Sequence, residues 1–289
     1  MAKFLISAFA DEACDLLDGQ IVALKRNGLH CIEPRSMGGN IIKKTDEELY
    51  AIRKQLDAAE ITVPSLGSPI GKFDIKEDFE IHLQEFRRAL RACEILGAKR
   101  MRIFSFFVDQ TELAQYRDEV MRRMNILLEM ADKAGVMLCH ENESKIYGQN
   151  PAEVRDLLTN LHGLRGIFDA ANFVRNKQDP IEGFEATVDR LEYIHVKDAR
   201  FEDRSMTPVG EGDGQYREIL QRVDKMTDRE IVLTIEPHLF TFAAYKKIDR
   251  MELKHKYVYD NADEAFDSAV SALKALLASI GHPVVDGRA

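Results

Sequence analysis

Short apolar runs alternate with amphipathic segments along the whole chain. Eight runs rich in β-branched and aromatic residues lie at 3–10, 28–35, 61–67, 100–107, 135–143, 165–173, 191–198 and 230–238. Between them, the spacing of apolar residues predicts helices, most clearly at 46–60, 79–98 and 262–281. Strands that alternate with helices favour a parallel sheet with right-handed crossovers.

Eight such units in 289 residues predict an α/β fold of the (β/α)₈ TIM barrel type, with residues 1–289 as one domain. The alternative is an open, doubly wound sheet, which usually has a glycine-rich first turn. Here the first turn reads "AFADEACD", without a GxGxxG motif. In a barrel the carboxyl ends of the strands form the active face, so polar residues at strand ends are the first candidates for a site.

Composition narrows the class of protein. Hydrophobic residues make up 45% of the chain, and the net charge is -9. An acidic chain is a poor general surface for nucleic acid or for an anionic membrane, so neither partner is expected. The four cysteines are widely spaced and include no CxxC pair, which indicates free thiols in a reducing compartment. The start "MAKFLISAFADE" lacks the pattern of a secretory signal, and a cytoplasmic location is expected.

Four consecutive predicted strands each end in a good metal ligand: Glu141, Asp169, His195 and Glu236. Neighbouring strands lie about 4.8 Å apart, so four adjacent strand ends can converge on one point. Any one of these residues alone would ordinarily be a solvated, capping or packing group. Together, three carboxylates and one imidazole favour one divalent metal ion, namely Mn²⁺, Mg²⁺, Co²⁺ or Zn²⁺.

The motifs "HENE", "FDAAN", "IHVKD", "PVGEGDG" and "IEP", with "SAFADE", "IEPRS" and "GSPIGK" nearer the start, resemble the xylose-isomerase-like barrel superfamily. The resemblance implies one metal ion held by Glu141, Asp169, His195 and Glu236. It also implies a divalent-metal-dependent isomerase or epimerase of a sugar, sugar phosphate or related keto-polyol. Glu141 and Glu236 would be the catalytic acid and base, moving a proton through a metal-stabilised enediolate.

Five further residues are candidates for substrate binding: Asn172, Arg200, Lys197, Glu33 and His238. Many epimerases of the superfamily carry a histidine where this chain has Asn172, which weakens a specific epimerase assignment. Arg200 and Lys197 have an alternative interpretation as ion-pair partners of Glu202 and Asp198. For the other two residues, Glu33 could instead brace the barrel through an arginine, and Pro237 could turn His238 away from the site.

Three other functions compete with the isomerase. A metal-dependent dehydratase of a cyclic polyol or dehydroshikimate type shares the fold and the enolate chemistry. A non-catalytic sugar-binding barrel is a second alternative, although such a protein would be expected to lose ligands. A DNA-repair endonuclease is disfavoured, because its zinc cluster needs additional histidines that the first four strand ends lack.

The expected partner is a small carbohydrate, and the resemblance makes a homodimer or homotetramer an expectation. The long segment 239–261 is larger than a plain connection. It is expected to be either a lid over the site or a subunit contact.

Overall fold

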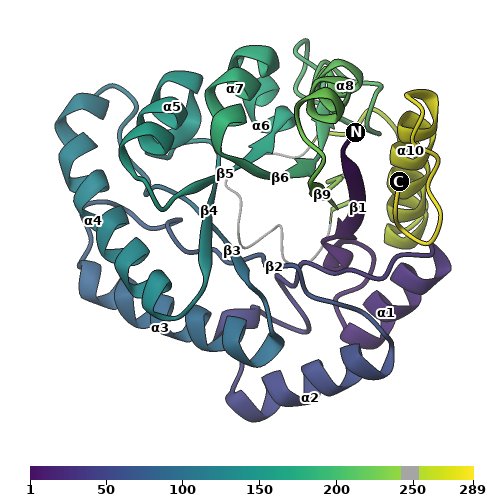
Figure 1. Ribbon diagram of the computed structural model, residues 1–289, viewed down its shortest axis with the longest axis horizontal. Helices are drawn as coiled ribbons and strands as arrows, with labels where there is room; N and C mark the ends of the chain where they lie inside the picture. The colour runs from purple at the N-terminus through teal and green to yellow at the C-terminus, as the bar shows by residue number, and fades with distance from the viewer. Residues whose placement is uncertain (242–253) are drawn as a thin grey trace.

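Parallel strands form the inner wall of the computed structural model, which describes residues 1–241 and 254–289. Seven strands lie in the order β1-β9-β6-β5-β4-β3-β2, and each neighbouring pair is parallel. Figure 1 looks down the ring of strands and shows the helices around its outside. The strands are β1 Lys3–Ala8, β2 Ser65–Leu66, β3 Arg100–Ile103, β4 Met137–Glu141, β5 Arg165–Asp169, β6 Leu191–Val196 and β9 Glu230–Ile235. The predicted α/β TIM barrel is confirmed.

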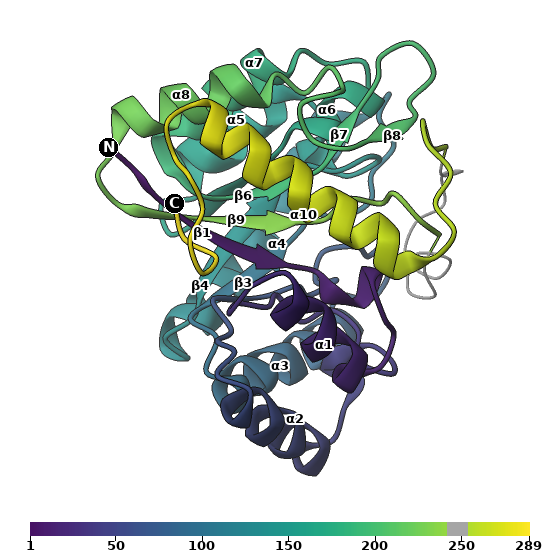
Figure 2. The same ribbon diagram turned by 90° about the vertical axis from the view of Figure 1, so that its right-hand side faces the viewer.

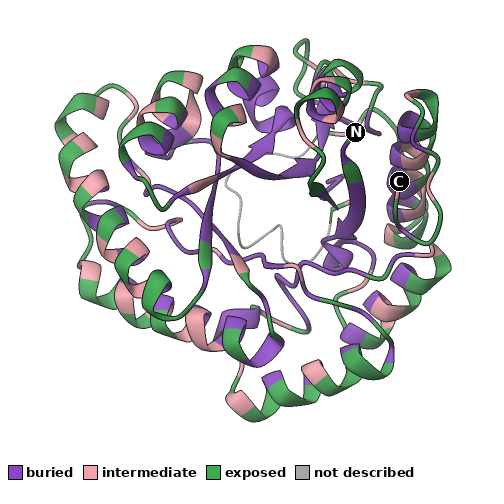
Figure 3. Cartoon of the chain, in the orientation of Figure 1, coloured by how far each residue is buried: buried purple, intermediate pink, exposed green. Residues whose placement is uncertain are grey.

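The helices form the outer layer, and each buries one face against the strands (Figure 3). Their bounds are α1 Leu17–Arg26, α2 Asp46–Ala58, α3 Phe79–Leu96, α4 Leu113–Lys133, α5 Pro151–Asn160, α6 Ala170–Arg175, α7 Pro180–Thr187, α8 Tyr216–Met226 and α10 Ala262–Ser279. Figure 2 shows α10 lying across the outside of the wall beside β1 and β9.

Local chemistry fixes the ends of the helices that the sequence predicted. Helix α2 begins at a reciprocal capping box in which Thr45 and Glu48 each satisfy the other's backbone N–H. Asp78 caps α3, which ends at Gly97 with φ +75°, a left-handed conformation that glycine adopts without strain. Asn261 caps α10. Three of the predicted helices are therefore confirmed, with ends within two residues of the prediction.

The predicted strand at 28–35 is not a regular strand. Only Cys31 forms a bridge there, to Thr62, and the amide of Glu33 donates to the Ala8 carbonyl. Pro34 has no N–H to donate to a ladder. Residues 287–289 take much of the free edge of β1 instead. Phe4 exchanges two backbone hydrogen bonds with Ala289, and the amide of Ile6 donates to the Gly287 carbonyl.

Apolar side chains fill the barrel below its mouth. They form a separate buried cluster of Leu5, Cys31, Cys139, Ile167, Tyr193 and Val232. The main hydrophobic core lies between the sheet and the helices. The interior is thus packed, and a large group of buried polar side chains lies toward the carboxyl ends of the strands.

A small antiparallel hairpin, β7 Asp198–Ala199 with β8 Met206–Thr207, stands at the mouth. Asp198 organises the glycine-rich loop that follows, accepting backbone N–H groups from Gly210, Gly212 and Gly214. Residues 254–256 then pair with Met206. The expected lid at 239–261 falls mainly on residues 242–253, which lie outside the described residues.

All four cysteines are free thiols, as expected: Cys31, Cys93 and Cys139 are buried, and Cys14 is partly exposed. Among the described residues, no helix is both long enough and apolar enough to cross a membrane.

Candidate metal centre

The sheet register brings the four predicted metal ligands to one level. Glu141 ends β4 and Asp169 ends β5, while Glu236 directly follows β9. Asp169 pairs with His195 on β6, and the next β6 residue, Val196, pairs with Ile235, the last residue of β9. All four side chains therefore enter the mouth from neighbouring strands, as the sequence predicted.

A bulge between β5 and β6 makes this alignment possible. Gly166 pairs with Leu191, but the next residue, Ile167, pairs with Tyr193, so Glu192 has no partner on β5. Without this shift, Asp169 would lie beside Ile194 rather than His195. Since successive side chains of a strand point to opposite faces, a shift of one residue decides whether the two ligands share a face.

The four side chains are buried, and one ligand atom of each lies within 4.8 Å of those of the others. His195 is at the centre. Its Nδ1 atom is 3.1 Å from Glu141 Oε1 and 3.4 Å from Glu236 Oε2. Neither ring nitrogen of His195 has the geometry of a hydrogen bond. A buried imidazole nitrogen without a hydrogen bond, facing carboxylate oxygens, is what a metal position requires.

Lys197 also belongs to this cluster. Its Nζ atom is 2.9 Å from Asp169 Oδ2 and 3.4 Å from Glu236 Oε2, and the side chain is 3% exposed. The alternative pairing with Asp198 does not account for it, since Asp198 is occupied by the glycine-rich loop. Lys197 therefore places a buried ammonium group beside the ligand set.

The protonation states follow from burial and from these neighbours. Burial raises the pKa of Asp169 to about 7, despite the opposing charge of Lys197. Burial would raise the pKa of Glu141 too, but the His195 imidazole and the Arg102 guanidinium lower it to about 2. The pKa of Glu236 is also lowered, because Lys197 and His195 outweigh its burial. Glu141 and Glu236 are thus anionic at neutral pH.

The charges around the mouth favour a bound cation. Among the described residues, the buried carboxyl groups of this region outnumber its buried cationic side chains: Asp11, Glu12, Glu33, Glu141, Asp169 and Glu236 lie with Arg35, Arg102 and Lys197. Burial raises the pKa of Glu12 to about 8 and that of Asp169 to about 7, and a divalent ion bound nearby would favour the charged form of both carboxyl groups. The hard oxygen donors and the imidazole suit Mn²⁺, Mg²⁺, Co²⁺ or Zn²⁺.

A second group of ligand-type residues adjoins the first. Glu12 and His238 lie with Glu236 so that one ligand atom of each is within 4.8 Å of the others. Arg35 already pairs with both glutamates of this group, since its Nη1 is 2.7 Å from Glu236 Oε1 and its Nη2 is 3.2 Å from Glu12 Oε1. The guanidinium therefore stands where a second cation would otherwise be needed.

Two of the five substrate-binding candidates, Asn172 of α6 and Glu33, contact the candidate ligands. The Nδ2 atom of Asn172 is 3.4 Å from Glu141 Oε1. Glu33 is fully buried, and its Oε2 lies 3.4 Å from His195 Nε2. Glu33 also accepts hydrogen bonds from the hydroxyls of Tyr193 and Thr234, at 2.9 and 2.8 Å. It therefore contacts His195 on the ring edge opposite Nδ1.

Of the other three candidates, two lie at the cluster and one lies away from it. Lys197 is inside the cluster, as described. His238 is buried at its rim with φ +49°, and its backbone N–H donates to Glu12. Arg200 is not brought to the cluster: its guanidinium pairs with the exposed Glu202 at 2.7 Å. That ion pair is the alternative that the sequence left open for Arg200.

Sequence reasoning missed Arg102, which lies in the middle of β3. Its Nη1 is 3.2 Å from Glu141 Oε2 and 3.7 Å from Glu236 Oε1, so it contacts both predicted catalytic glutamates. Asp11 and Glu12 of the first loop were missed as well, and both bind Arg35. The available signal was a charged residue in an apolar strand, since such a side chain needs buried partners.

Cations and aromatic rings alternate along the wall of the mouth that faces the ligands. Arg35 lies over Phe9, with its guanidinium carbon 4.4 Å from the ring centre. Arg102 lies 4.8 Å from Phe9 and 5.1 Å from Phe104, while Nζ of Lys72 lies 4.6 Å from Phe104. These contacts fix the cationic groups in place.

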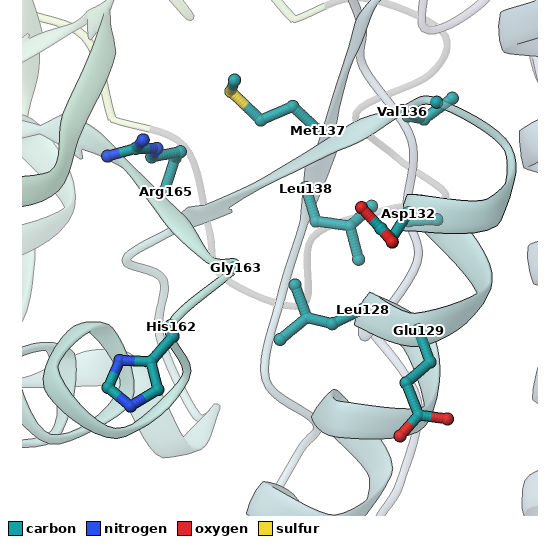
Figure 4. A pocket seen from close by; sticks show the side chains of 11 residues that line it. Leu128, Glu129, Asp132, Val136, Met137, Leu138, His162, Gly163 and Arg165 are labelled. Atoms are coloured by element: carbon teal, nitrogen blue, oxygen red, sulfur yellow. The ribbon is translucent and has the colours of Figure 1, made fainter.

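A separate surface groove of about 480 Å³ lies at the other end of the barrel (Figure 4). Met137 and Arg165, which begin β4 and β5, line it together with the end of α4. Its lining mixes aliphatic side chains with charged ones, and it is remote from the four candidate ligands at the carboxyl ends of the same strands. It is therefore not part of the candidate metal centre.

Several solved structures share this fold. D-psicose 3-epimerase, in the presence of D-fructose, superposes with a TM-score of 0.72 at 16% identity, over 96% of this chain and 99% of the other. The IOLI protein with a bound zinc atom gives 0.73 at 14%, over 96% and 99%. The probable 3-DHS dehydratase AsbF from Bacillus anthracis gives 0.70 at 14%, over 94% and 98%. At such identities the likeness establishes the fold.

No curated protein matches this sequence. The family model described as "Xylose isomerase-like TIM barrel" matches residues 21–276, most of the chain. The matched region contains all four candidate metal ligands. The chain belongs to the xylose isomerase-like TIM barrel family.

Proposed function

We propose that this protein is a divalent-metal-dependent isomerase or epimerase of a sugar, a sugar phosphate or a related keto-polyol. The observation that carries the proposal is the placement of Glu141 and Glu236. Each directs one carboxylate oxygen toward His195 Nδ1, at 3.1 and 3.4 Å, from different strands. Two anionic carboxylates on either side of one position can remove a proton from a substrate carbon and return one.

Glu141, Asp169, His195 and Glu236 would hold the metal. When bound, the ion would polarise a carbonyl oxygen and so acidify the neighbouring carbon-bound hydrogen. Glu141 and Glu236 would then act as base and acid. Return of the proton to the opposite face of the same carbon gives epimerisation, and return to the adjacent carbon gives isomerisation. Asn172 and Lys197 would bind substrate hydroxyl or carbonyl oxygens. The same fold carries a D-psicose 3-epimerase, which supports this reaction class.

One observation favours a dehydratase as the second candidate. Lys197 places a buried ammonium 2.9 Å from Asp169 and 3.4 Å from Glu236. After a glutamate removes the proton, a nearby ammonium could protonate a departing hydroxyl, and water would leave. A probable dehydratase also has this fold. The same metal and glutamates would serve both reactions, and the fate of the hydroxyl distinguishes them.

Metal content per chain is the first test. The purified protein is expected to hold about one divalent ion, measured by inductively coupled plasma mass spectrometry, and a folded Asp169→Ala, His195→Ala double variant is expected to hold none. Glu143→Gln is a matched control, because Glu143 is a glutamate of the same mouth that pairs with Lys72 at 2.8 Å. A wild-type chain that stays empty after incubation with Mn²⁺, Co²⁺ and Zn²⁺ contradicts the proposal.

Isotope exchange then separates the two reactions. The loaded enzyme is incubated in D₂O with ketoses, sugar phosphates, cyclic polyols and dehydroshikimate. An isomerase or epimerase incorporates deuterium at the reacting carbon of a product with unchanged composition. A dehydratase gives a product that is lighter by one water. A protein that binds a sugar and causes neither change would be the non-catalytic barrel.

A further inference from the structure

We propose that Arg102 and Arg35 are positioning residues that occupy one oxygen of Glu141 and one of Glu236, so that each glutamate offers a single oxygen to the metal. The inference rests on the proposed function, because it concerns the same metal centre. Neither arginine would bind the metal itself; each would act through the glutamate that it contacts. It also explains how the centre would keep coordination positions free for a substrate.

The two oxygens of Glu141 face different partners. Oε1 is 3.1 Å from Nδ1 of His195 and 3.4 Å from the amide nitrogen of Asn172. Oε2 accepts a hydrogen bond from Arg102 Nη1 at 3.2 Å. Oε1 therefore faces the candidate metal position, and Oε2 is hydrogen-bonded to the guanidinium.

Glu236 repeats the pattern from another strand. Its Oε2 is 3.4 Å from both His195 Nδ1 and Lys197 Nζ. Its Oε1 accepts a hydrogen bond from Arg35 Nη1 at 2.7 Å and lies 3.7 Å from Arg102 Nη1. Both glutamates thus divide their oxygens between the metal side and an arginine.

The arginines are themselves held in place. Arg102 is 4% exposed, and its Nε and Nη2 donate to the carbonyls of Ser68 and Gly67 at 3.3 and 3.4 Å. Arg35 makes a two-point contact with Asp11, at 2.9 and 3.0 Å. A planar guanidinium with fixed donors imposes direction on a carboxylate, which a flexible ammonium does not.

The consequence concerns the number of ligands. A carboxylate can bind a divalent ion through one oxygen or through two. While Oε2 of Glu141 is held by Arg102, two-oxygen binding would strain or break a buried charged hydrogen bond and bring the guanidinium charge closer to the ion. Removing the guanidinium would free Oε2 to approach the ion, and it would also remove a nearby positive charge. The site would then bind the ion more tightly but keep fewer open positions.

The test uses Mn²⁺ on the full chain, with water-proton relaxation to count exchangeable waters on the bound ion and calorimetry for affinity. In Arg102→Gln we expect about one water fewer than in the wild type, because a second glutamate oxygen takes its position. We also expect the Kd for Mn²⁺ to fall on the order of tenfold. Lys72→Gln is the control: it removes a cation from the same wall, but one that pairs with Glu143, and should change neither quantity.

A folded Arg102→Gln variant whose water count and affinity equal those of Lys72→Gln would overturn the inference, and so would weaker binding. If Arg102→Gln does not fold, Arg102→Lys carries the test. A lysine ammonium keeps the positive charge but lacks the fixed planar donors of the guanidinium, so a smaller loss of water is expected, and an unchanged count would overturn the inference. A wild-type chain that binds no metal would contradict the proposed function itself.

Discussion

Glu33 lies against the edge of the His195 ring that faces away from the other candidate metal ligands: Glu33 Oε2 is 3.4 Å from Nε2, while Nδ1 lies 3.1 Å from Glu141. The carboxylate is held from below by the hydroxyls of Tyr193 and Thr234. A carboxylate in this position fixes the orientation of an imidazole and makes it a better ligand. The barrel interior and the candidate metal centre are therefore connected through Glu33.

Replacing Glu33 by glutamine should weaken metal binding about 10- to 100-fold, because the amide supports the imidazole less well than a carboxylate does. Calorimetric titration with Zn²⁺ or Mn²⁺ measures the change. Glu192→Gln is a matched control, since Glu192 is a buried glutamate at the other end of β6, where it pairs with Arg100. Equal affinities in the two variants would speak against a supporting role for Glu33.

His82 should make the protein less stable in mild acid. Burial lowers the pKa of His82 to about 4 from an ordinary 6.5, with Glu85 and Arg123 as its charged neighbours. Its Nε2 accepts the Gly71 amide, which requires the neutral ring. A lowered pKa means that the stabilisation is complete above pH 6.5 and is lost as the pH falls toward 4.

We therefore expect the unfolding free energy of His82→Gln to fall less than that of the wild type between pH 6.5 and 4. Urea unfolding of the metal-free proteins at several pH values gives both curves. His140, whose pKa burial also lowers to about 4, remains in both proteins and contributes equally. Parallel curves would show that His82 does not titrate on unfolding.

The loop around Asp198 should not tolerate a side chain at Gly212. A Cβ atom there would lie 2.3 Å from Asp198 Oδ1 and 2.6 Å from the Ala199 carbonyl oxygen. Gly212→Ala is expected to destabilise the protein by about 1–3 kcal/mol, measured by urea unfolding. At Gly163 a Cβ would meet only Leu128, at 3.4 Å, so Gly163→Ala serves as the control. A loss no larger than that of the control would show that the loop can rearrange.

Thiol titration should distinguish one cysteine from the other three. Cys14 is partly exposed, whereas Cys31, Cys93 and Cys139 are buried, and burial raises the pKa of each of the three. The thiolate is the reactive form. The native protein should consume about one equivalent of a disulfide reagent quickly, and four after unfolding. A Cys14→Ser variant should lose the fast phase. If the fast phase persisted in this variant, the rapidly reacting thiol would be one of the other three cysteines.

Periodicity predicted the repeating strands and helices because each element has one buried face. It failed at 28–35, where apolar residues predicted a ladder that does not form. The pattern predicts that this segment is buried, and Cys31 and Ile32 are indeed buried. The backbone partner is what the pattern cannot report, and residues 287–289 take that place along β1.

The convergence of the four candidate ligands was predictable because parallel strands end at one level, so position along the chain gives position in the mouth. The partners of those ligands were not. Arg102 precedes the end of its strand: the pairing of β3 with β4 brings it near Glu141, and the closed barrel brings it near Glu236. For Lys197, neighbours in sequence suggested a pairing with Asp198, but the fold gives it Asp169.

The pairing of residues 287–289 with β1 has a consequence for biosynthesis. Phe4 and Ile6 leave the ribosome well before their partners Ala289 and Gly287, which follow hundreds of residues later in the chain. This edge of β1 cannot pair until translation has passed residue 289, because its partner does not exist before then. Even afterwards, contacts between such distant segments form slowly. Nascent chains would meanwhile expose an unpaired strand edge, the kind of surface that chaperones shield from aggregation.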